Sequence, residues 1–104
     1  EFHIDFGAER LIGAEKNGEK IAVEVKSFLG ASFSSEFHQA LGQFNNYFVA
    51  LEAEEPNREL FLAVPEQVFT DYFQTPHVQK VIERYSIRLI IFSEETSTIV
   101  SWKS

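Results

Sequence analysis

The stretch Ile21-Ala22-Val23-Glu24-Val25-Lys26-Ser27 sets a carboxylate and an ammonium two residues apart within an otherwise apolar run. Side chains on a β-strand alternate between the two faces of the sheet, so Glu24 and Lys26 share one face and the apolar residues take the other. A carboxylate can bind Mg²⁺, and a neighbouring lysine can steady a water nucleophile or a phosphoryl charge. The spacing alone is weak evidence, because an amphipathic surface strand shows the same alternation with both charges in solvent.

This strand is the second arm of a predicted β-hairpin. Asn17-Gly18 separates residues 9–16 from residues 19–27. Asn-Gly is the strongest two-residue turn signal, because both central residues of a type I′ turn need positive φ. A two-residue loop also determines which residues pair across the hairpin. The expected pairs on the carboxylate face are Leu11 with Glu24 and Glu9 with Lys26.

A first strand over residues 2–6 precedes the hairpin. It contains Asp5, a second carboxylate that could join Glu24 at a metal ion. The chain either continues straight into the hairpin or breaks at Gly7, since an isolated glycine in a strand often marks a bulge. In a straight strand the four residues from Asp5 to Glu9 would cover roughly 13 Å, so only a bulge or bend near Gly7 would carry Asp5 to Glu24.

A long helix is expected after a loop over residues 27–33. Ser34 or Ser35 can cap its N-terminus, and it ends near Glu54, before Pro56. Apolar residues recur at the i, i+3, i+4, i+7 spacing of one helix face, which predicts that this face packs on the sheet. The apolar stripe comprises Phe37, Ala40, Leu41, Phe44, Phe48 and Leu51.

The second half of the chain alternates strands and short helices. Residues 59–64 form an almost continuous apolar run, typical of a buried central strand that pairs in parallel after a helical crossover. Helices are expected over residues 66–73 and 76–85, and strands over residues 87–92 and 98–102. This order predicts one α/β domain with a mixed sheet.

Two polar residues lie at the edge of the stripe on the long helix. Gln43 and Tyr47 are four residues apart, so they lie one above the other. Because this helix directly follows the strand of Glu24 and Lys26, the amide and the phenol could face a metal ion or a phosphate. The plain alternative is an amide at the rim and a half-buried ring whose hydroxyl reaches water.

Composition limits the classes of protein to consider. The 104 residues have room for one small domain, 1–104. There is no cysteine and the three histidines are scattered singly, which excludes disulfides and argues against a zinc site. No apolar run approaches the roughly 20 residues that cross a bilayer, and no signal-peptide pattern is visible. We expect a soluble, cytoplasmic protein without a membrane partner.

The formal net charge is −7, from 16 acidic and 9 basic residues. Nucleic-acid-binding proteins usually present a basic surface, because the release of counterions from phosphates drives their affinity. We therefore expect only weak DNA binding by this chain alone. A metal ion, a basic partner or an upstream segment could offset the repulsion. The sequence contains no methionine and starts in a strand, so we expect a fragment that lacks an N-terminal helix.

The motifs together resemble a nuclease superfamily. Asp5, Glu24-Val25-Lys26 and Gln43 with Tyr47 resemble the PD-(D/E)xK nucleases, in particular those with an additional Q-x-x-x-Y motif. A narrower resemblance, to the XisH family, covers nearly the whole length. The segments that carry it are Ile4 to Ile12, Ile21 to Gly30, Ala40 to Gln43 with Tyr47, Leu62 to Pro65 and Ile99 to Trp102.

These resemblances imply a restriction-endonuclease-like α/β fold, with a long helix after the central hairpin. In the nuclease superfamily the aspartate and the E-x-K glutamate bind Mg²⁺, or Mn²⁺ in its place, and the lysine assists attack of water on phosphate. The implied catalytic residues are Asp5, Glu24, Lys26, Gln43 and Tyr47, and the implied metal ligands are Asp5 and Glu24, with Glu9 as the alternative acid. The XisH family is named for factors that control site-specific excision of a DNA element, the fdxN element. Its members act alongside a recombinase and a second small controlling protein, XisI, so these are the implied partners.

Three functions remain open at the level of the sequence. The first is a Mg²⁺-dependent endonuclease that acts in excision. The second is a catalytically inactive nuclease-fold regulatory module that acts through a protein partner. The excess of acidic over basic residues favours the second. The third is a structural protein in which Glu24 and Lys26 merely pair on a sheet surface. Eleven phenylalanines exceed what one small core needs, so an interface, such as that of a homo-oligomer, is also expected.

Overall fold

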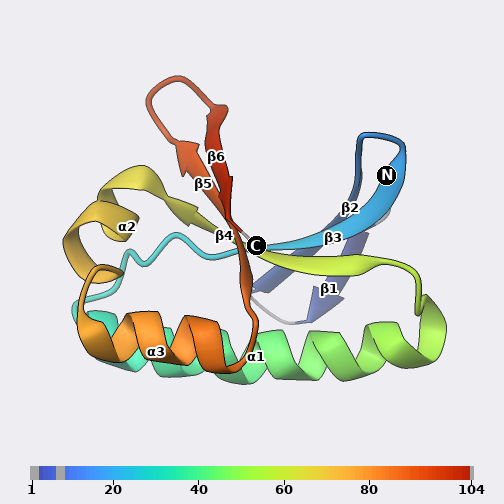
Figure 1. Cartoon of the computed structure of the whole chain (residues 1–104), viewed down its shortest axis with the longest axis horizontal. Helices are drawn as coiled ribbons and strands as arrows, with labels where there is room; N and C mark the ends of the chain where they lie inside the picture. The colour runs from blue at the N-terminus through green and yellow to red at the C-terminus, as the bar shows by residue number, and fades with distance from the viewer. Residues whose placement is uncertain (1–2, 7–8, 104) are drawn as a thin grey trace.

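The computed structural model describes the backbone of residues 3–6 and 9–103 and the side chains of residues 11–103. The described strands form one mixed six-stranded sheet in the order β1-β2-β3-β4-β5-β6 (Figure 1). The parallel pairs are β3–β4 and β4–β5, and the other neighbours are antiparallel. The elements are β1 (His3–Phe6), β2 (Glu9–Lys16), β3 (Glu19–Val25), α1 (Phe33–Glu54), β4 (Glu59–Pro65), α2 (Glu66–Tyr72), α3 (Pro76–Arg84), β5 (Arg88–Ser93) and β6 (Thr98–Lys103). This is the expected restriction-endonuclease-like layout, with the long helix α1 after the central hairpin.

The predicted hairpin is confirmed. Asn17 and Gly18 have φ values of 52° and 83°, as a type I′ turn requires. Leu11 pairs with Glu24, as expected, and the β2–β3 ladder runs from this end of the hairpin to the turn.

The first strand folds back on the hairpin instead of continuing into it. β1 pairs antiparallel with β2, so Asp5 lies opposite Arg10, and Arg10 lies opposite Val25 of β3. Gly7, where a bend was expected, lies outside the described residues. Two strand spacings are about 10 Å, so the strand pairing brings the backbone of Asp5 closer to β3 than a straight strand would.

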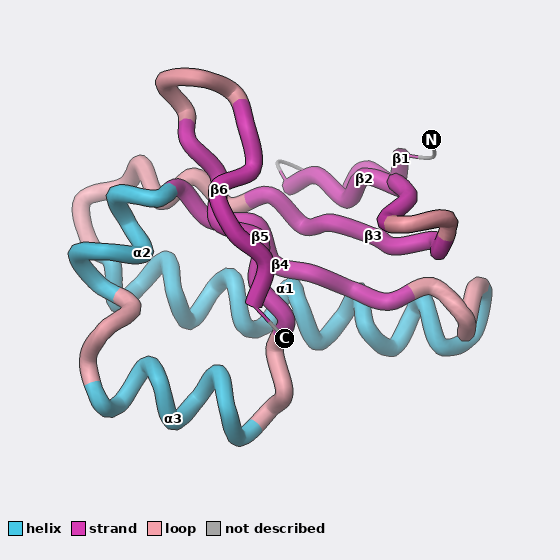
Figure 2. The backbone as a smooth tube through the Cα atoms, turned by 45° about the horizontal axis from the view of Figure 1, so that its top comes forward, coloured by secondary structure: helices cyan, strands magenta, loops and turns pink. Residues whose placement is uncertain are grey.

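All the described helices lie on one side of the sheet, as Figures 1 and 2 show. The main core forms between the sheet and residues of α1, α2 and α3, whereas the smaller core on the opposite face consists of strand residues. No helix of the described chain has the length and apolar character needed to cross a membrane. The helix-covered face is therefore the one on which β3 and α1 meet.

Helix α1 starts earlier than the sequence predicted. Its N-cap is Ser32, whose hydroxyl accepts a hydrogen bond from the backbone N–H of Ser35 at 3.2 Å, so the expected caps, Ser34 and Ser35, are wrong. All three serines can cap chemically, and packing makes the choice. With Phe33 in the first turn, its ring stacks on Phe37 four residues later, at a centroid distance of 5.4 Å.

The apolar stripe of α1 is also turned slightly from the predicted one. Phe48, predicted to be in the core, is 47% exposed, whereas Tyr47 is 2% exposed. Positions 47 and 48 differ by about 100° around the helix, so a small rotation of the helix exchanges them. The buried residues of α1 are Phe37, Ala40, Phe44, Tyr47 and Leu51.

The second half of the chain follows the prediction closely. β4 lies between β3 and β5 and pairs in parallel with both. The two short helices and the last two strands end within one or two residues of their expected limits. The carboxyl ends of β3, β4 and β5 consequently meet at one edge of the sheet.

Candidate functional site

Glu24 and Lys26 face α1 and are buried. Their side chains are 0% and 6% exposed. In the sheet, Leu11 and Leu62 flank Glu24 in register, and both belong to the core beneath α1. The shared face of the two charges is thus confirmed, whereas the alternative that both are solvated on the sheet surface is wrong.

The backbone keeps Lys26 in the strand pattern although β3 formally ends one residue earlier. The N–H of Lys26 donates to the carbonyl oxygen of Ala63 at 3.0 Å, which extends the β3–β4 ladder by one residue. Strand alternation therefore holds through Lys26, and a lysine can bury its stem while its ammonium keeps a polar partner. This explains how a charged residue remains on the buried face.

Lys26 contacts α1 through a residue that the sequence analysis missed. Its Nζ donates a hydrogen bond to Oε1 of Gln39 at 3.1 Å. Gln39 precedes Gln43 by one helical step of four residues, so the three residues Gln39, Gln43 and Tyr47 form one row along α1. That spacing was the available signal. The contact places Gln39, the N-terminal member of the row, against the end of β3.

The two predicted residues of the row are more buried than a helix rim would make them. Tyr47 belongs to the main core and its hydroxyl oxygen is buried, so the alternative of a hydroxyl in water is wrong. Gln43 is partly buried, and its Oε1 is buried without a hydrogen bond from the described residues. The structure thus brings an amide oxygen and a phenol to the side of α1 that faces the sheet.

The loop after Lys26 is held by specific contacts. Phe28 has a φ of 58°, a conformation that is unusual for a bulky residue, and its ring packs 5.4 Å from that of Phe33. The N–H of Gly30 donates to a carboxylate oxygen of Glu36 at 2.5 Å, and a Cβ at Gly30 would lie 2.6 Å from that oxygen. These contacts hold the loop between Lys26 and α1 against the start of the helix.

Comparison with known proteins places the chain in a family. A family model described as XisH protein matches residues 1–100. The chain belongs to the XisH family. The crystal structure of an XisH family protein from Nostoc punctiforme PCC 73102 is similar with 43% sequence identity and a TM-score of 0.87, over 99% of this chain and 83% of that chain.

A second solved relative agrees with this assignment. It is a fdxN element excision controlling factor protein from Anabaena variabilis, with 42% identity and a TM-score of 0.86, over 99% of this chain and 82% of that chain. No curated protein matches the chain. The XisH resemblance expected from the sequence is thus confirmed.

The acid that would complete the site in this XisH-family chain lies among residues whose side chains are not described. In the strand ladder, Ile4 is in register with Leu11 and hence with Glu24. Asp5 is one row away, in register with Val25, which packs against the smaller core on the opposite face of the sheet. Among the side chains described, no group of three or more His, Cys, Asp or Glu residues could hold a metal ion. The assignments of Asp5 and Glu9 as metal ligands therefore stay predictions.

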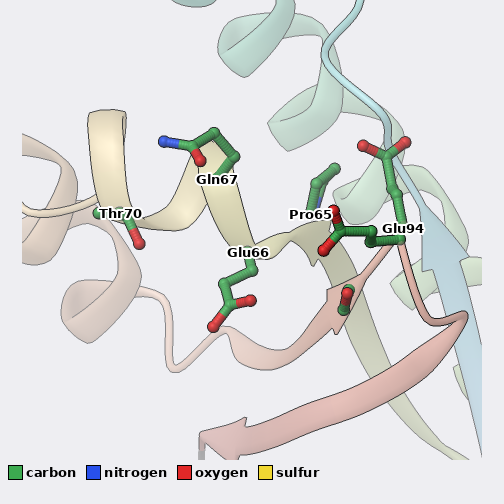
Figure 3. A pocket seen from close by; sticks show the side chains of 7 residues that line it. Pro65, Glu66, Gln67, Thr70 and Glu94 are labelled. Carbon is green, nitrogen blue, oxygen red and sulfur yellow. The ribbon is translucent and has the colours of Figure 1, made fainter.

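An acidic hollow lies at the sheet edge where the parallel strands of this XisH-family chain end. It measures about 580 Å³, and Figure 3 shows the carboxylates of Glu66 and Glu94 beside it. The carboxyl ends of parallel strands are where ligands of open α/β sheets commonly bind. The negative charges of this hollow would repel a phosphate. The lining residues are Pro65, Glu66, Gln67, Thr70, Ser93, Glu94 and Glu95.

Proposed function

We propose that this chain acts in the control of DNA-element excision and carries a phosphodiester-hydrolysing metal site of the PD-(D/E)xK type. The name of the Anabaena variabilis relative supports the first part. The observation that carries the second is the burial of Glu24 and Lys26 on the helix-covered face of the sheet, where Lys26 is bonded to Gln39 of α1. Burying charge costs free energy of desolvation that an apolar pair would not, and such departures from local rules concentrate at functional sites.

The donor set is consistent with a hard divalent cation. The Glu24 carboxylate would bind Mg²⁺ or Mn²⁺ together with Asp5 or Glu9, since these ions prefer oxygen ligands. The buried Oε1 of Gln43 is a further oxygen acceptor on the facing helix. When bound, the metal would supply an acidified water and polarise a phosphoryl oxygen.

The residues of the chain have separate roles in this proposal. Lys26 offsets negative charge that develops on the phosphate. Gln43 and Tyr47, which lie one and two helical steps beyond Gln39 on the same side of α1, orient the phosphate or the water. Glu24 fixes the position of the metal relative to Lys26, because both project from the same strand two residues apart.

Cleavage assays test the proposal directly. Supercoiled and linear DNA are incubated with the wild-type chain and with Lys26→Ala at millimolar Mg²⁺ or Mn²⁺. We expect cleavage by the wild type and a loss of at least 100-fold in the variant, as removal of one charge-stabilising group typically gives about 10²–10³. Lys80→Ala removes an exposed lysine of α3 and is the matched control. Equal cleavage by wild type and Lys26→Ala would contradict the proposal.

Paramagnetic broadening identifies the second acid. Mn²⁺ is titrated into the isotope-labelled chain while the side-chain resonances of Asp5, Glu9 and Glu24 are followed. Early broadening of Glu24 together with Asp5 or with Glu9 selects between the two. No broadening of Glu24 at millimolar Mn²⁺ counts against a metal site.

A second function, a regulatory module that does not cut DNA, is favoured by a specific observation. The acidic hollow lies at the sheet edge where β3 ends, and the net charge is −7. Such a module would act through an XisI-like controlling protein and the recombinase. A stable complex with the XisI-like protein, combined with no cleavage of any DNA form, would select this function over hydrolysis.

A further inference from the structure

The polar row on α1 leads from solvent into the core. Gln39 is exposed, Gln43 is partly buried and Tyr47 is fully buried. The three are spaced by four residues, so the gradient follows one side of the helix toward its C-terminal half. Gln39 is thus the solvent-facing end of the row, and it is also the residue that holds the Lys26 ammonium, at 3.1 Å.

We propose that Gln39 is a positioning residue, which fixes the Lys26 ammonium at the solvent-facing end of the candidate site. This inference rests on the proposed hydrolytic function. A lysine side chain is a flexible stem with three rotatable donors, so a charge delivered to a phosphate must be oriented by an acceptor. Gln39 accepts from one of the three donors of the Lys26 ammonium.

The chemistry of the amide suits this role better than a carboxylate would. The Oε1 acceptor is neutral, so it orients the ammonium without cancelling its charge. A glutamate at position 39 would form an ion pair and compete with the phosphate for Lys26. The Nε2 group of Gln39 makes no hydrogen bond within the described part of the chain, and it remains a donor for an incoming phosphate oxygen.

Chemical labelling of Lys26 tests the proposal without any need for cleavage. Reductive methylation of each lysine is followed by mass spectrometry in the wild type, in Gln39→Met and in His38→Ala. Methionine keeps the length of the side chain and removes the acceptor, and His38 is the next exposed residue of the same helix. We expect Lys26 to react about tenfold faster in Gln39→Met, from the strength of a hydrogen bond to a charged group, and unchanged in His38→Ala.

Gln39→Glu separates positioning from charge. The carboxylate can still accept from Lys26, so slow labelling should return, whereas the rate of DNA cleavage should stay reduced because the cation is neutralised. In Gln39→Met we expect kcat to fall with little change in KM.

The outcomes distinguish the two proposals. Equal labelling of Lys26 in wild type and Gln39→Met would overturn the role of Gln39, whether or not DNA is cleaved. Faster labelling in a chain that cleaves no DNA would support the positioning of Lys26 by Gln39 and would reject the hydrolytic function.

Discussion

At the scale of single residues, Glu24 and Lys26 occupy positions that strand alternation assigns to the core. Their neighbours in register, Leu11 and Leu62, are apolar and buried. Replacing a buried ionic pair by packed apolar residues is often neutral or stabilising, so stability alone does not account for charges at these positions. Their burial on the face covered by α1 is the observation on which the proposed site rests.

Gln43→Met separates stability from function at one position. The Oε1 of Gln43 is buried without a hydrogen bond from the described residues, and a buried acceptor left unsatisfied costs about 1–3 kcal/mol. Methionine fills a similar volume without this cost. We expect the free energy of unfolding, measured by urea denaturation, to rise by about 1 kcal/mol, and Mn²⁺ affinity to fall.

Gln79→Met is the matched control, because the amide of Gln79 donates to the carbonyl oxygen of Phe73. Losing that bond should lower the free energy of unfolding by about 1 kcal/mol. If Gln43→Met destabilises the chain as much as Gln79→Met does, the amide of Gln43 satisfies a structural need and the interpretation fails.

At the scale of elements, the first turn of α1 links the cap of the helix to the candidate site. Ser32 caps the helix, Phe33 packs on Phe37, and Gln39 follows within two turns. The loop between Lys26 and the cap is tied to the same turn by the bond from Gly30 to the Glu36 carboxylate. The position of Gln39 over Lys26 thus depends on where the helix begins.

Ser32→Ala tests whether Ser32 caps α1. Loss of an N-cap serine costs about 0.5–2 kcal/mol, so we expect a decrease of about 1 kcal/mol in the free energy of unfolding, measured by chemical denaturation. Ser34→Ala and Ser35→Ala remove exposed hydroxyls that do not cap, and should change stability by less than about 0.5 kcal/mol. A larger loss in Ser34→Ala than in Ser32→Ala would place the cap where the sequence alone first predicted it.

At the scale of the whole molecule, local signals predicted the elements and long-range packing decided the rest. The Asn17-Gly18 turn, the apolar run of β4 and the long helix each have a signature within a few residues. The return of β1 onto β2 has none, because it depends on the pairing of the two strands. The exchange of Tyr47 for Phe48 in the core likewise depends on how α1 rotates against the sheet.

The residues of the candidate site also divide into those that local signals predict and those that only long-range contacts bring together. Glu24 and Lys26 were predictable because alternation along a strand places both on one face. Gln39 was missed because its spacing of four residues from Gln43 is a weak signal for an exposed glutamine until the Lys26 contact is seen. The acidic hollow joins residues after β4 and residues after β5, which only the parallel pairing of these strands brings together.

We expect the carboxylates of the acidic hollow to weaken DNA binding. Replacing Glu66, Glu94 and Glu95 by Gln removes three carboxylates from the edge at which β3 ends. Three unit charges about 10 Å from a phosphate contribute roughly 1 kcal/mol of repulsion in water, so the Kd for a short DNA duplex should fall about fivefold at low salt. Fluorescence anisotropy measures this Kd, and the gain should shrink at 1 M salt, where the Debye length is about 3 Å.

The control replaces Glu19, Glu52 and Glu54, which lie at the β2–β3 turn and the C-terminal end of α1, away from α2 in Figure 1. Because both triple variants have the same net charge, an equal gain in affinity would show that total charge, and not the acidic edge, keeps DNA away from Lys26.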